Sequence, residues 1–410
     1  MKVAFFQQEV SKMKKQSYAG VAIAVYINYA IVGMATIFIS QYSTYFQKAW
    51  HTNVKGISLV LAAVGLGRLF TIFLAGSVSD RIGRRKTMLI SMISDVIFLL
   101  GAALAHNMIV AAIAAIFFGF TNSFGDTSSY PALTDAFPTR AATMNSLVKA
   151  FMSLAQFLFP FWVSTVSNAF VTAVCLSIFL VLDMLYICKI QFASQDKEEQ
   201  LEKIKNDEHI EEPSSKVKPS MAVDGALLIA MGFTICFTFY VFSQYLPNFG
   251  TSVLGVSPNQ AKTLVSFYAM ASMISVFVTA FLVTRIKHLV LISIYGTVSA
   301  LALFMMILTP SLTTARIGSI VIGFFAAGGI WQVGLAILTS YFPTGNGKLT
   351  SYYSFMASVT YFVGPLVSSF VISDTAASVL TVFWITAIIA AATIVIAVWL
   401  LVRNTRYHFE

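Results

Sequence analysis

Long runs of apolar residues recur along the whole chain, and polar residues gather in short breaks between them. Each run holds roughly 20 residues, which as an α-helix rising about 1.5 Å per residue is long enough to cross the hydrocarbon core of a bilayer. The pattern therefore predicts twelve membrane-spanning helices, at 19–41, 56–79, 87–106, 108–131, 142–165, 169–190, 222–247, 260–284, 288–308, 315–338, 349–371 and 378–402.

The composition supports an all-α membrane protein. Of the 410 residues, 58% are hydrophobic and 10% are charged, whereas about a quarter of a soluble domain is charged. The three cysteines and five histidines form no cluster with the spacing of a disulfide framework or a metal site. We therefore expect no metal and no cofactor, and no nucleotide-binding loop is present either.

The longest polar break, residues 191–221, divides six predicted spans from six. Its mixed charges and its Pro-Ser end are typical of a solvated linker. The predicted organisation is an N-terminal six-helix bundle at 1–190, a cytoplasmic linker at 191–221, and a C-terminal six-helix bundle at 222–410.

Basic residues are distributed unequally between the two sides of the predicted spans. If both termini are cytoplasmic, 20 of the 26 Lys and Arg residues lie inside and four lie outside, while Arg68 and Lys149 lie within spans. This bias predicts a multi-pass protein of the cell membrane with cytoplasmic termini. It also accounts for the net charge of +9 without a nucleic-acid partner.

The two halves of the chain share short matching segments. "TDAFPT" at 134–139 matches "TSYFPT" at 339–344 at an offset of 205, which also aligns Ser153 with Ser358 and Phe157 with Phe362. Several matches at one offset indicate a duplication. Two parallel six-helix repeats place a solute site between the halves, near the midplane of the bilayer.

The loop after the second span reads "GSVSDRIGRRK", and its residue types suggest a closing device on the inner side. Gly76 allows close helix packing and Gly83 a tight turn. Asp80 would be attracted to the positive helix N-terminus near Thr350 and Ser351. We expect the basic residues of the loop to pair with Asp135 when that side is closed; they are Arg81, Arg84 and Arg85. The alternative is that these basic residues only set the topology.

The pattern G-x-x-x-D-R-x-G-R-R between spans two and three resembles the signature of the major facilitator superfamily. The resemblance extends over the chain, because the twelve spans, the repeat and the central linker match as well. It implies two bundles that rock about a central cavity with alternating access. Two features of many drug/proton antiporters in that family are missing: Ala115 stands where they carry an arginine, and span five reads "SLAQFLFPFWVS".

Five ionisable residues lie deep within the predicted spans, all in the N-terminal half: Arg68, Asp95, Asp126, Lys149 and Asp183. Such residues are costly in a membrane and usually face a cavity or a partner. Arg68 lies on a stripe of small residues, so we expect it to bind an anionic substrate or take part in coupling. The alternative is a structural ion pair with Asp95 or Asp126.

Asp126 and Lys149 lie at similar predicted depths on adjacent spans, so we expect them to pair. Proton uptake by Asp126, or capture of Lys149 by an anion, would then open the pair and couple transport; otherwise the pair is static. For Asp95 and Asp183, a role in helix packing is favoured over proton relay.

The C-terminal half offers neutral and aromatic candidates for contact with a solute. Tyr240, Gln244 and Asn248 share one helix face at four-residue steps, and Trp331 and Gln332 follow a run of small residues in span ten. Trp331 is the repeat mate of Asp126, so the two are predicted to face each other across the cavity. The alternative for each aromatic residue is packing within the membrane.

The predicted function is that of a monomeric secondary transporter which moves a small, anionic organic solute by alternating access, with proton coupling as in a symporter. The rival within transport is efflux of amphipathic drugs or flipping of a lipid, which the aromatic content favours. A membrane-embedded enzyme would need a catalytic cluster, and a sensor would need a signalling domain; neither is found in the sequence.

Overall fold

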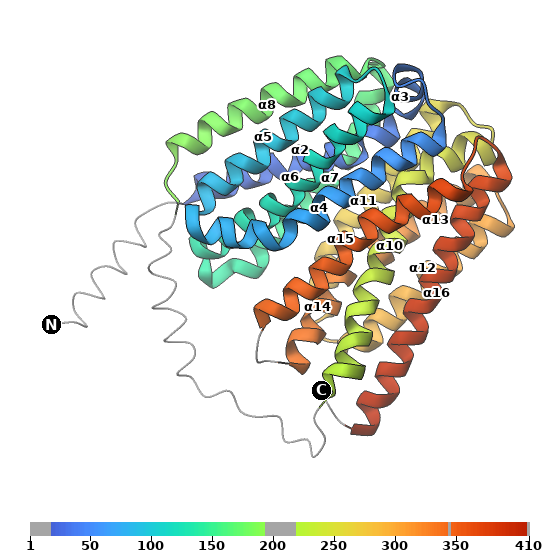
Figure 1. Ribbon diagram of the computed structural model, residues 1–410. Coiled ribbons are helices and arrows are strands. Elements are labelled where there is room, and N and C mark those ends of the chain that lie inside the picture. The colour runs from blue at the N-terminus through green and yellow to red at the C-terminus, as the bar shows by residue number, and fades with distance from the viewer. Residues whose placement is uncertain (1–17, 193–218, 343–345, 408–410) are drawn as a thin grey trace.

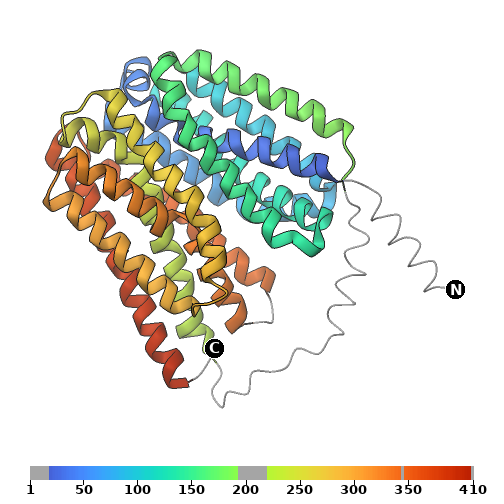
Figure 2. The same cartoon turned by 180° about the vertical axis from the view of Figure 1, so that it is seen from behind.

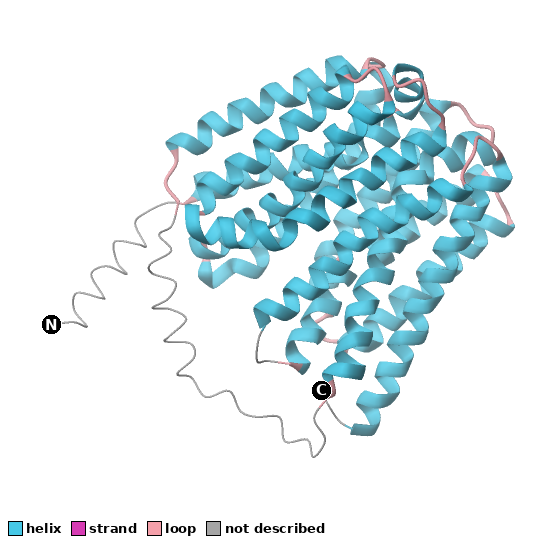
Figure 3. Cartoon of the chain, viewed as in Figure 1, coloured by secondary structure: helices cyan, strands magenta, loops and turns pink. Residues whose placement is uncertain are grey.

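The computed structural model describes residues 18–192, 219–342 and 346–407. Within these ranges twelve helical segments are long and apolar enough to cross a membrane, and no strand occurs (Figure 3). The predicted all-α class and the number of spans are confirmed. The N-terminal segment and the predicted linker at 191–221, apart from its ends, lie outside the described residues.

The described helices that precede residue 193 correspond closely to the predicted spans. Three of them begin where an asparagine side chain caps the helix: Asn53, Asn107 and Asn168 each accept a hydrogen bond from a backbone N–H of the following first turn. The helices are α2 (Ala19–Gln41), α3 (Ser43–Ala49), α4 (Val54–Ile82), α5 (Arg84–Leu104), α6 (Met108–Ala136), η1 (Pro138–Arg140), α7 (Ala141–Thr165) and α8 (Ala169–Lys189).

The described helices that follow residue 218 form the other six spans, two of which contain π-helical turns. They are η3 (Met221–Gly225), α10 (Ala226–Asn248), η4 (Phe249–Val253), α11 (Pro258–Leu282), α12 (His288–Leu308), α13 (Leu312–Ile322), η5 (Gly323–Ala327), α14 (Ile330–Tyr341), α15 (Asn346–Val371) and α16 (Ala376–Tyr407).

The tenth span is broken, although the sequence predicted one continuous helix at 315–338. After η5 the chain leaves the helix at Gly328, and Gly329 has a φ of 112°. That conformation is open to glycine and strained for other residues. The span therefore consists of two helical parts, α13 with η5 and α14.

The six helices on each side of the 193–218 gap form two groups that lie side by side (Figures 1 and 2). The groups meet along two helix pairs, α4 with α15 and α7 with α11. They diverge toward the side of the molecule where α2 begins, α8 ends, α10 begins and α16 ends. We call this the termini side.

Residues related by the sequence repeat occupy both helix pairs that join the halves. On α15, Ser358 accepts a hydrogen bond from Arg68 of α4 at 3.1 Å. On α7, Ser153 lies 3.4 Å from Ser272 of α11, and the Phe157 carbonyl accepts a hydrogen bond from Ser266. The aligned serines of the repeat therefore serve the same purpose, which is contact between halves.

Candidate functional site

Arg68 and Asp126 form an ion pair within the first half, next to its contact with α15. Nη2 of Arg68 on α4 lies 2.8 Å from Oδ2 of Asp126 on α6, and the arginine is 8% exposed. The second carboxylate oxygen, Oδ1, accepts a hydrogen bond from the Tyr29 hydroxyl at 2.8 Å. Of the two structural partners considered for Arg68, Asp126 is the one observed.

The same guanidinium also reaches the second half. Its Nε donates to the hydroxyl of Ser358, and its Cζ lies 5.0 Å from the centre of the Tyr361 ring. Tyr361 stacks on Tyr240 with a centroid distance of 4.0 Å. A single cation thus links the carboxylate of one half to hydroxyl and aromatic groups of the other.

Three glycines bring these groups together by allowing close contact between helices. A Cβ on Gly119 of α6 would lie 2.3 Å from a backbone oxygen of α4, and one on Gly67 would lie 2.2 Å from the Ile116 oxygen. A Cβ on Gly65 would lie 2.0 Å from the backbone nitrogen of Phe362. Because real Cβ atoms do not approach so closely, larger residues would force α6 and α15 away from Arg68.

Lys149 does not pair with Asp126, so this expectation was wrong. The depth argument compared positions along the two helices and left the direction of the side chains open. α7 packs chiefly against α2 and α11, and Nζ of Lys149 lies 5.8 Å from the centre of the Phe239 ring on α10. Among the described residues, Lys149 has no carboxylate partner.

The three residues predicted to share one face of α10 have different surroundings. Tyr240 belongs to the aromatic stack beside Arg68. Gln244 is 1% exposed and donates through Nε2 to the Thr36 carbonyl of α2 at 2.9 Å, so it joins the two halves. Asn248 is partly exposed at the end of α10. In this conformation only Tyr240 lies next to the ion pair.

Trp331 and Gln332 lie at the start of α14, directly after the break at Gly329. The Trp331 ring lies 4.9 Å from that of Tyr353, and its carbonyl accepts a hydrogen bond from the Tyr353 hydroxyl. The indole N–H has no acceptor among the described residues, and Gln332 is exposed. The position of Trp331 opposite Asp126 remains a prediction.

The loop motif forms a small charge network on the termini side of the first half. Arg84 lies 2.9 Å from the Asp80 carboxylate and 3.8 Å from that of Asp135, which confirms the pairing with Asp135 for one arginine. Arg85 instead donates to the Ile190 carbonyl and stacks over Phe192. Arg81 is exposed.

The first part of the motif, at the end of α4, does not contact the described residues of the other half of the protein. The Asp80 side chain is 72% exposed and pairs with Arg84, not with the start of α15. A Cβ on Gly76 would meet nothing within 4 Å, so the close packing expected there is absent in this conformation. Gly83, with a φ of 88°, makes the predicted tight turn.

Three further buried carboxylates differ in whether they have a hydrogen-bond donor. Asp95 on α5 and Asp183 on α8 are 0% and 4% exposed, and neither has a hydrogen-bond donor among the described residues. Asp224, which is fully buried in η3, is bonded by Nε and Nη2 of Arg403 on α16. No sequence signal pointed to this pairing, because Asp224 and Arg403 lie at opposite ends of the second half of the chain.

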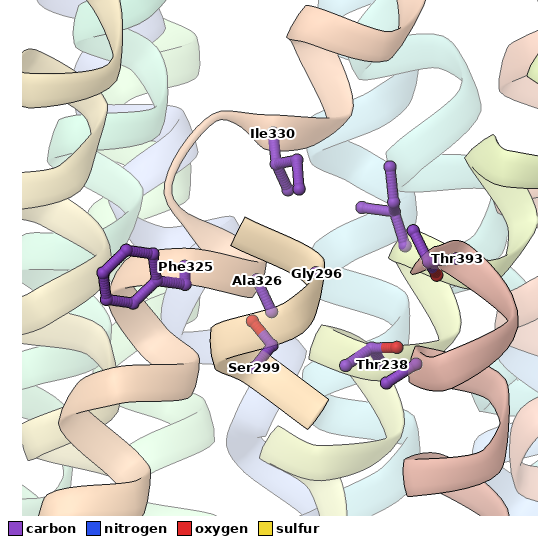
Figure 4. Close-up of a pocket in the computed structure, with 9 residues that line it drawn as sticks. Thr238, Gly296, Ser299, Phe325, Ala326, Ile330 and Thr393 are labelled. Carbon is purple, nitrogen blue, oxygen red and sulfur yellow. The ribbon is translucent and has the colours of Figure 1, made fainter. Parts of the chain in front are cut away.

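A small cavity lies inside the second half, away from the ion pair (Figure 4). It has a volume of about 10 Å³ and is lined by Thr238, Ser299 and Thr393 among mainly apolar side chains. A buried water needs roughly 10–15 Å³. The cavity therefore has room for about one water and not for an organic solute.

Sequence reasoning missed several residues that surround the Arg68–Asp126 ion pair. Tyr29 and Ser358 contact the ion pair directly, and the Tyr130 ring packs edge-on against Tyr29 at 5.6 Å. The repeat supplied a signal for Ser358, since it aligns with Ser153. For the tyrosines no sequence signal separates cavity contact from packing in a chain with 16 tyrosines.

Comparison with known sequences gives consistent matches over the whole chain. The sequence model of the Major Facilitator Superfamily matches residues 21–324 and 253–408. The inner membrane transport protein YdiM of Escherichia coli (strain K12) is 31% identical over 405 residues, covering 96% of this chain and 97% of that protein. The inner membrane transport protein YdiN of the same organism is 30% identical, covering 85% of this chain and 82% of that protein.

Solved structures show the same fold at low sequence identity. The D-xylose-proton symporter superimposes with a TM-score of 0.75 at 14% identity, covering 94% of this chain and 97% of that one. The nucleoside transporter NupG gives a TM-score of 0.71 at 13% identity, covering 94% and 98%.

Proposed function

Since the chain belongs to the major facilitator superfamily and is therefore a multi-pass membrane transporter rather than an enzyme, we propose that it carries a small organic anion by proton-coupled alternating access. The observation that carries this proposal is the Arg68–Asp126 ion pair, which also contacts Ser358 and Tyr361 of the opposite half. A change in the charge of Asp126 therefore alters contacts within the first half and, through Arg68, contacts between the two halves.

Asp126 is the proposed proton acceptor. Its carboxylate is 31% exposed, so water can reach it, and it is bonded to Arg68 and Tyr29. Protonation removes the negative charge and with it most of the attraction to the guanidinium. Arg68 is then free to form a two-pronged contact with a substrate carboxylate. Proton and anion would thus bind together, as symport requires.

Lys149 is the proposed second cation of the substrate site. It projects toward α10 of the other half and lacks a carboxylate partner among the described residues, so its charge is available to an anion. Tyr240, Trp331, Gln332 and Asn248 remain the proposed contacts on that half. Gln244 would contribute to closure between the halves, because its amide already joins α10 to α2.

The proposed transport cycle closes the termini side through the loop motif. With cytoplasmic termini and two bundles at 1–190 and 222–410, the divergence of the halves corresponds to an inward-facing state. Asp80, Arg84 and Asp135 form the part of the closing network that belongs to the first half. Approach of α15 would complete it. A monomer suffices for this cycle.

The proposed coupling agrees with one structural neighbour, which is named a proton symporter for D-xylose. Export of an amphipathic solute, or flipping of a lipid, is the second candidate. This second candidate is favoured by the stacked aromatic rings of Tyr240 and Tyr361. Under that function Arg68 would have a structural role only, and neutral or cationic amphiphiles would bind equally tightly to a variant that lacks its guanidinium.

The proposal is tested by ligand-dependent thermal stabilisation of the purified protein. A library of matched carboxylates and carboxamides, such as benzoate with benzamide, is run with sugars and lipophilic cations. A ligand that binds only the native state raises the unfolding temperature. Stabilisation by carboxylates alone, lost in Arg68→Gln, supports anion transport. Stabilisation by lipophilic cations alone, unchanged in Arg68→Gln, rejects it in favour of the second candidate.

A further inference from the structure

A basic groove lies on the termini side of the second half, remote from the Arg68–Asp126 pair. The turn between α11 and α12, residues 283–288, forms one wall, and Ala336 and Ser340 of α14 form the other. Its volume is about 620 Å³, and it contains Arg285, Lys287 and His288. This turn is the repeat counterpart of the loop motif in the first half.

The charges of Arg285 and Lys287 in this groove are not neutralised by carboxylates of the described residues. In residues 219–407 the acidic residues are Asp224, which pairs with Arg403, and Asp374, which follows α15 at the opposite end of the spans. In the first half, by contrast, Arg84 pairs with Asp80 and Asp135. Arg285 and Lys287 are exposed and form no ion pair with a described residue.

Arg285 stacks on an aromatic ring just after the end of α11. Its Cζ lies 4.6 Å from the centre of the Phe281 ring, which is 55% exposed. Stacking on an aromatic ring leaves the edge of the guanidinium, with its N–H donors, facing outward. Such a planar edge matches the oxygen pair of a phosphate.

An exposed apolar stripe on α11 leads from this groove toward the centre of the span. Ile274, Phe277 and Phe281 are 47%, 52% and 55% exposed and share one helix face at steps of three and four residues. From Ile274 to Arg285 the helix and its final turn rise about 16 Å, which is close to the depth of one leaflet of a bilayer core about 30 Å thick. An acyl chain would contact the apolar side chains of this stripe, whereas inorganic phosphate has no apolar part that could contact them.

We propose that this groove binds the phosphate of an anionic phospholipid, with Arg285 and Lys287 on the headgroup and the α11 stripe against an acyl chain. The site gives a role to the basic residues of this turn, in which Arg285 stands 205 residues after Asp80 of the loop motif. Because a bound lipid would lie against α11 and α14, it would stabilise the second half. The inference is independent of the transported solute.

The test uses the full-length protein in nanodiscs of phosphatidylcholine with increasing fractions of phosphatidylglycerol. Thermal unfolding is followed by tryptophan fluorescence, and retained lipid is counted by native mass spectrometry. Phosphatidylglycerol is expected to raise the unfolding midpoint. The variant Arg285→Gln/Lys287→Gln is expected to need about thirtyfold more of it for the same effect (about 2 kcal/mol), since two basic residues are removed.

The matched control is Lys86→Gln/Lys189→Gln, which removes two exposed cations from the same side of the first half. It should respond to phosphatidylglycerol like the wild type. Phe281→Leu keeps every charge and should weaken the response about two- to fivefold, through loss of the stacking. This variant also keeps the test decisive if the double variant fails to fold.

Three results would overturn the inference. The first is a response of Arg285→Gln/Lys287→Gln equal to that of the wild type, and the second is an equal loss in the Lys86→Gln/Lys189→Gln control, which would indicate general surface charge. The third is the same stabilisation by inorganic phosphate in discs of phosphatidylcholine alone, which would indicate a soluble anion as the ligand.

Discussion

The contact between Gly65 and α15 makes a quantitative prediction about how the halves are held together. A Cβ at residue 65 would lie 2.0 Å from the Phe362 nitrogen and 2.3 Å from the Tyr361 carbonyl carbon, both backbone atoms that no rotamer change can move. Ordinary contact begins at 3.4 Å, so α4 and α15 must separate by the difference of 1.4 Å. Overpacking of this kind costs about 1–3 kcal/mol.

The variant Gly65→Ala is therefore expected to shift the protein away from this conformation by about five- to 150-fold. Ser58 is a suitable reporter, because it is fully buried between the halves and accepts a hydrogen bond from Tyr245. In a background without the native cysteines, Ser58→Cys should react with a thiol reagent faster when Gly65→Ala is added. The thermal unfolding midpoint should fall as well.

The matched control is Gly76→Ala on the same helix, where a Cβ would meet nothing within 4 Å. It should leave labelling unchanged and keep or slightly raise stability, since alanine favours the helix. If Gly76 is packed closely in the other state, transport should fall although stability does not. Equal labelling rates and equal midpoints in Gly65→Ala and wild type would refute the reasoning.

Three further substitutions test the charged groups. Arg403→Gln should lower the free energy of unfolding by about 3 kcal/mol, because Asp224 stays buried without its cation, and adding Asp224→Asn should restore part of the loss in chemical denaturation. Asp126→Asn should abolish proton-driven accumulation in proteoliposomes but keep solute exchange, because the amide mimics the protonated carboxyl; accumulation at the wild-type rate would contradict its role. Lys149→Gln should weaken binding of a stabilising carboxylate about tenfold and leave a neutral ligand unaffected, as measured by titration.

The spans and the closing motif could be predicted from local sequence because their physics is local. Whether about 20 residues can cross a bilayer depends on their own side chains and on backbone hydrogen bonds made within the helix. The turn at Gly83 depends only on residues next to it in the chain. The Arg84–Asp135 pair joins helix ends that lie on the same side of the molecule. The break at Gly328 and Gly329 was missed because an apolar run looks the same whether or not its helix is continuous.

The partner of Asp126 could not be predicted from sequence. Residue counting gave its position along the span, and two cations, Arg68 and Lys149, were candidate partners. The choice depends on how each helix is rotated about its own axis, and that rotation is decided by which neighbours pack most closely.

The sequence by itself determined that this protein has twelve segments able to cross the membrane and that its deep charges belong to the first half, and its matching segments predicted a duplication of the halves. Only the tertiary structure decided that Arg68, rather than Lys149, neutralises Asp126 and reaches Ser358 across the interface. Gly65, Gly67 and Gly119 bring α15 and α6 against α4 at backbone distance. Close packing of these surfaces, a property of all three helices together, therefore selects the ion pair.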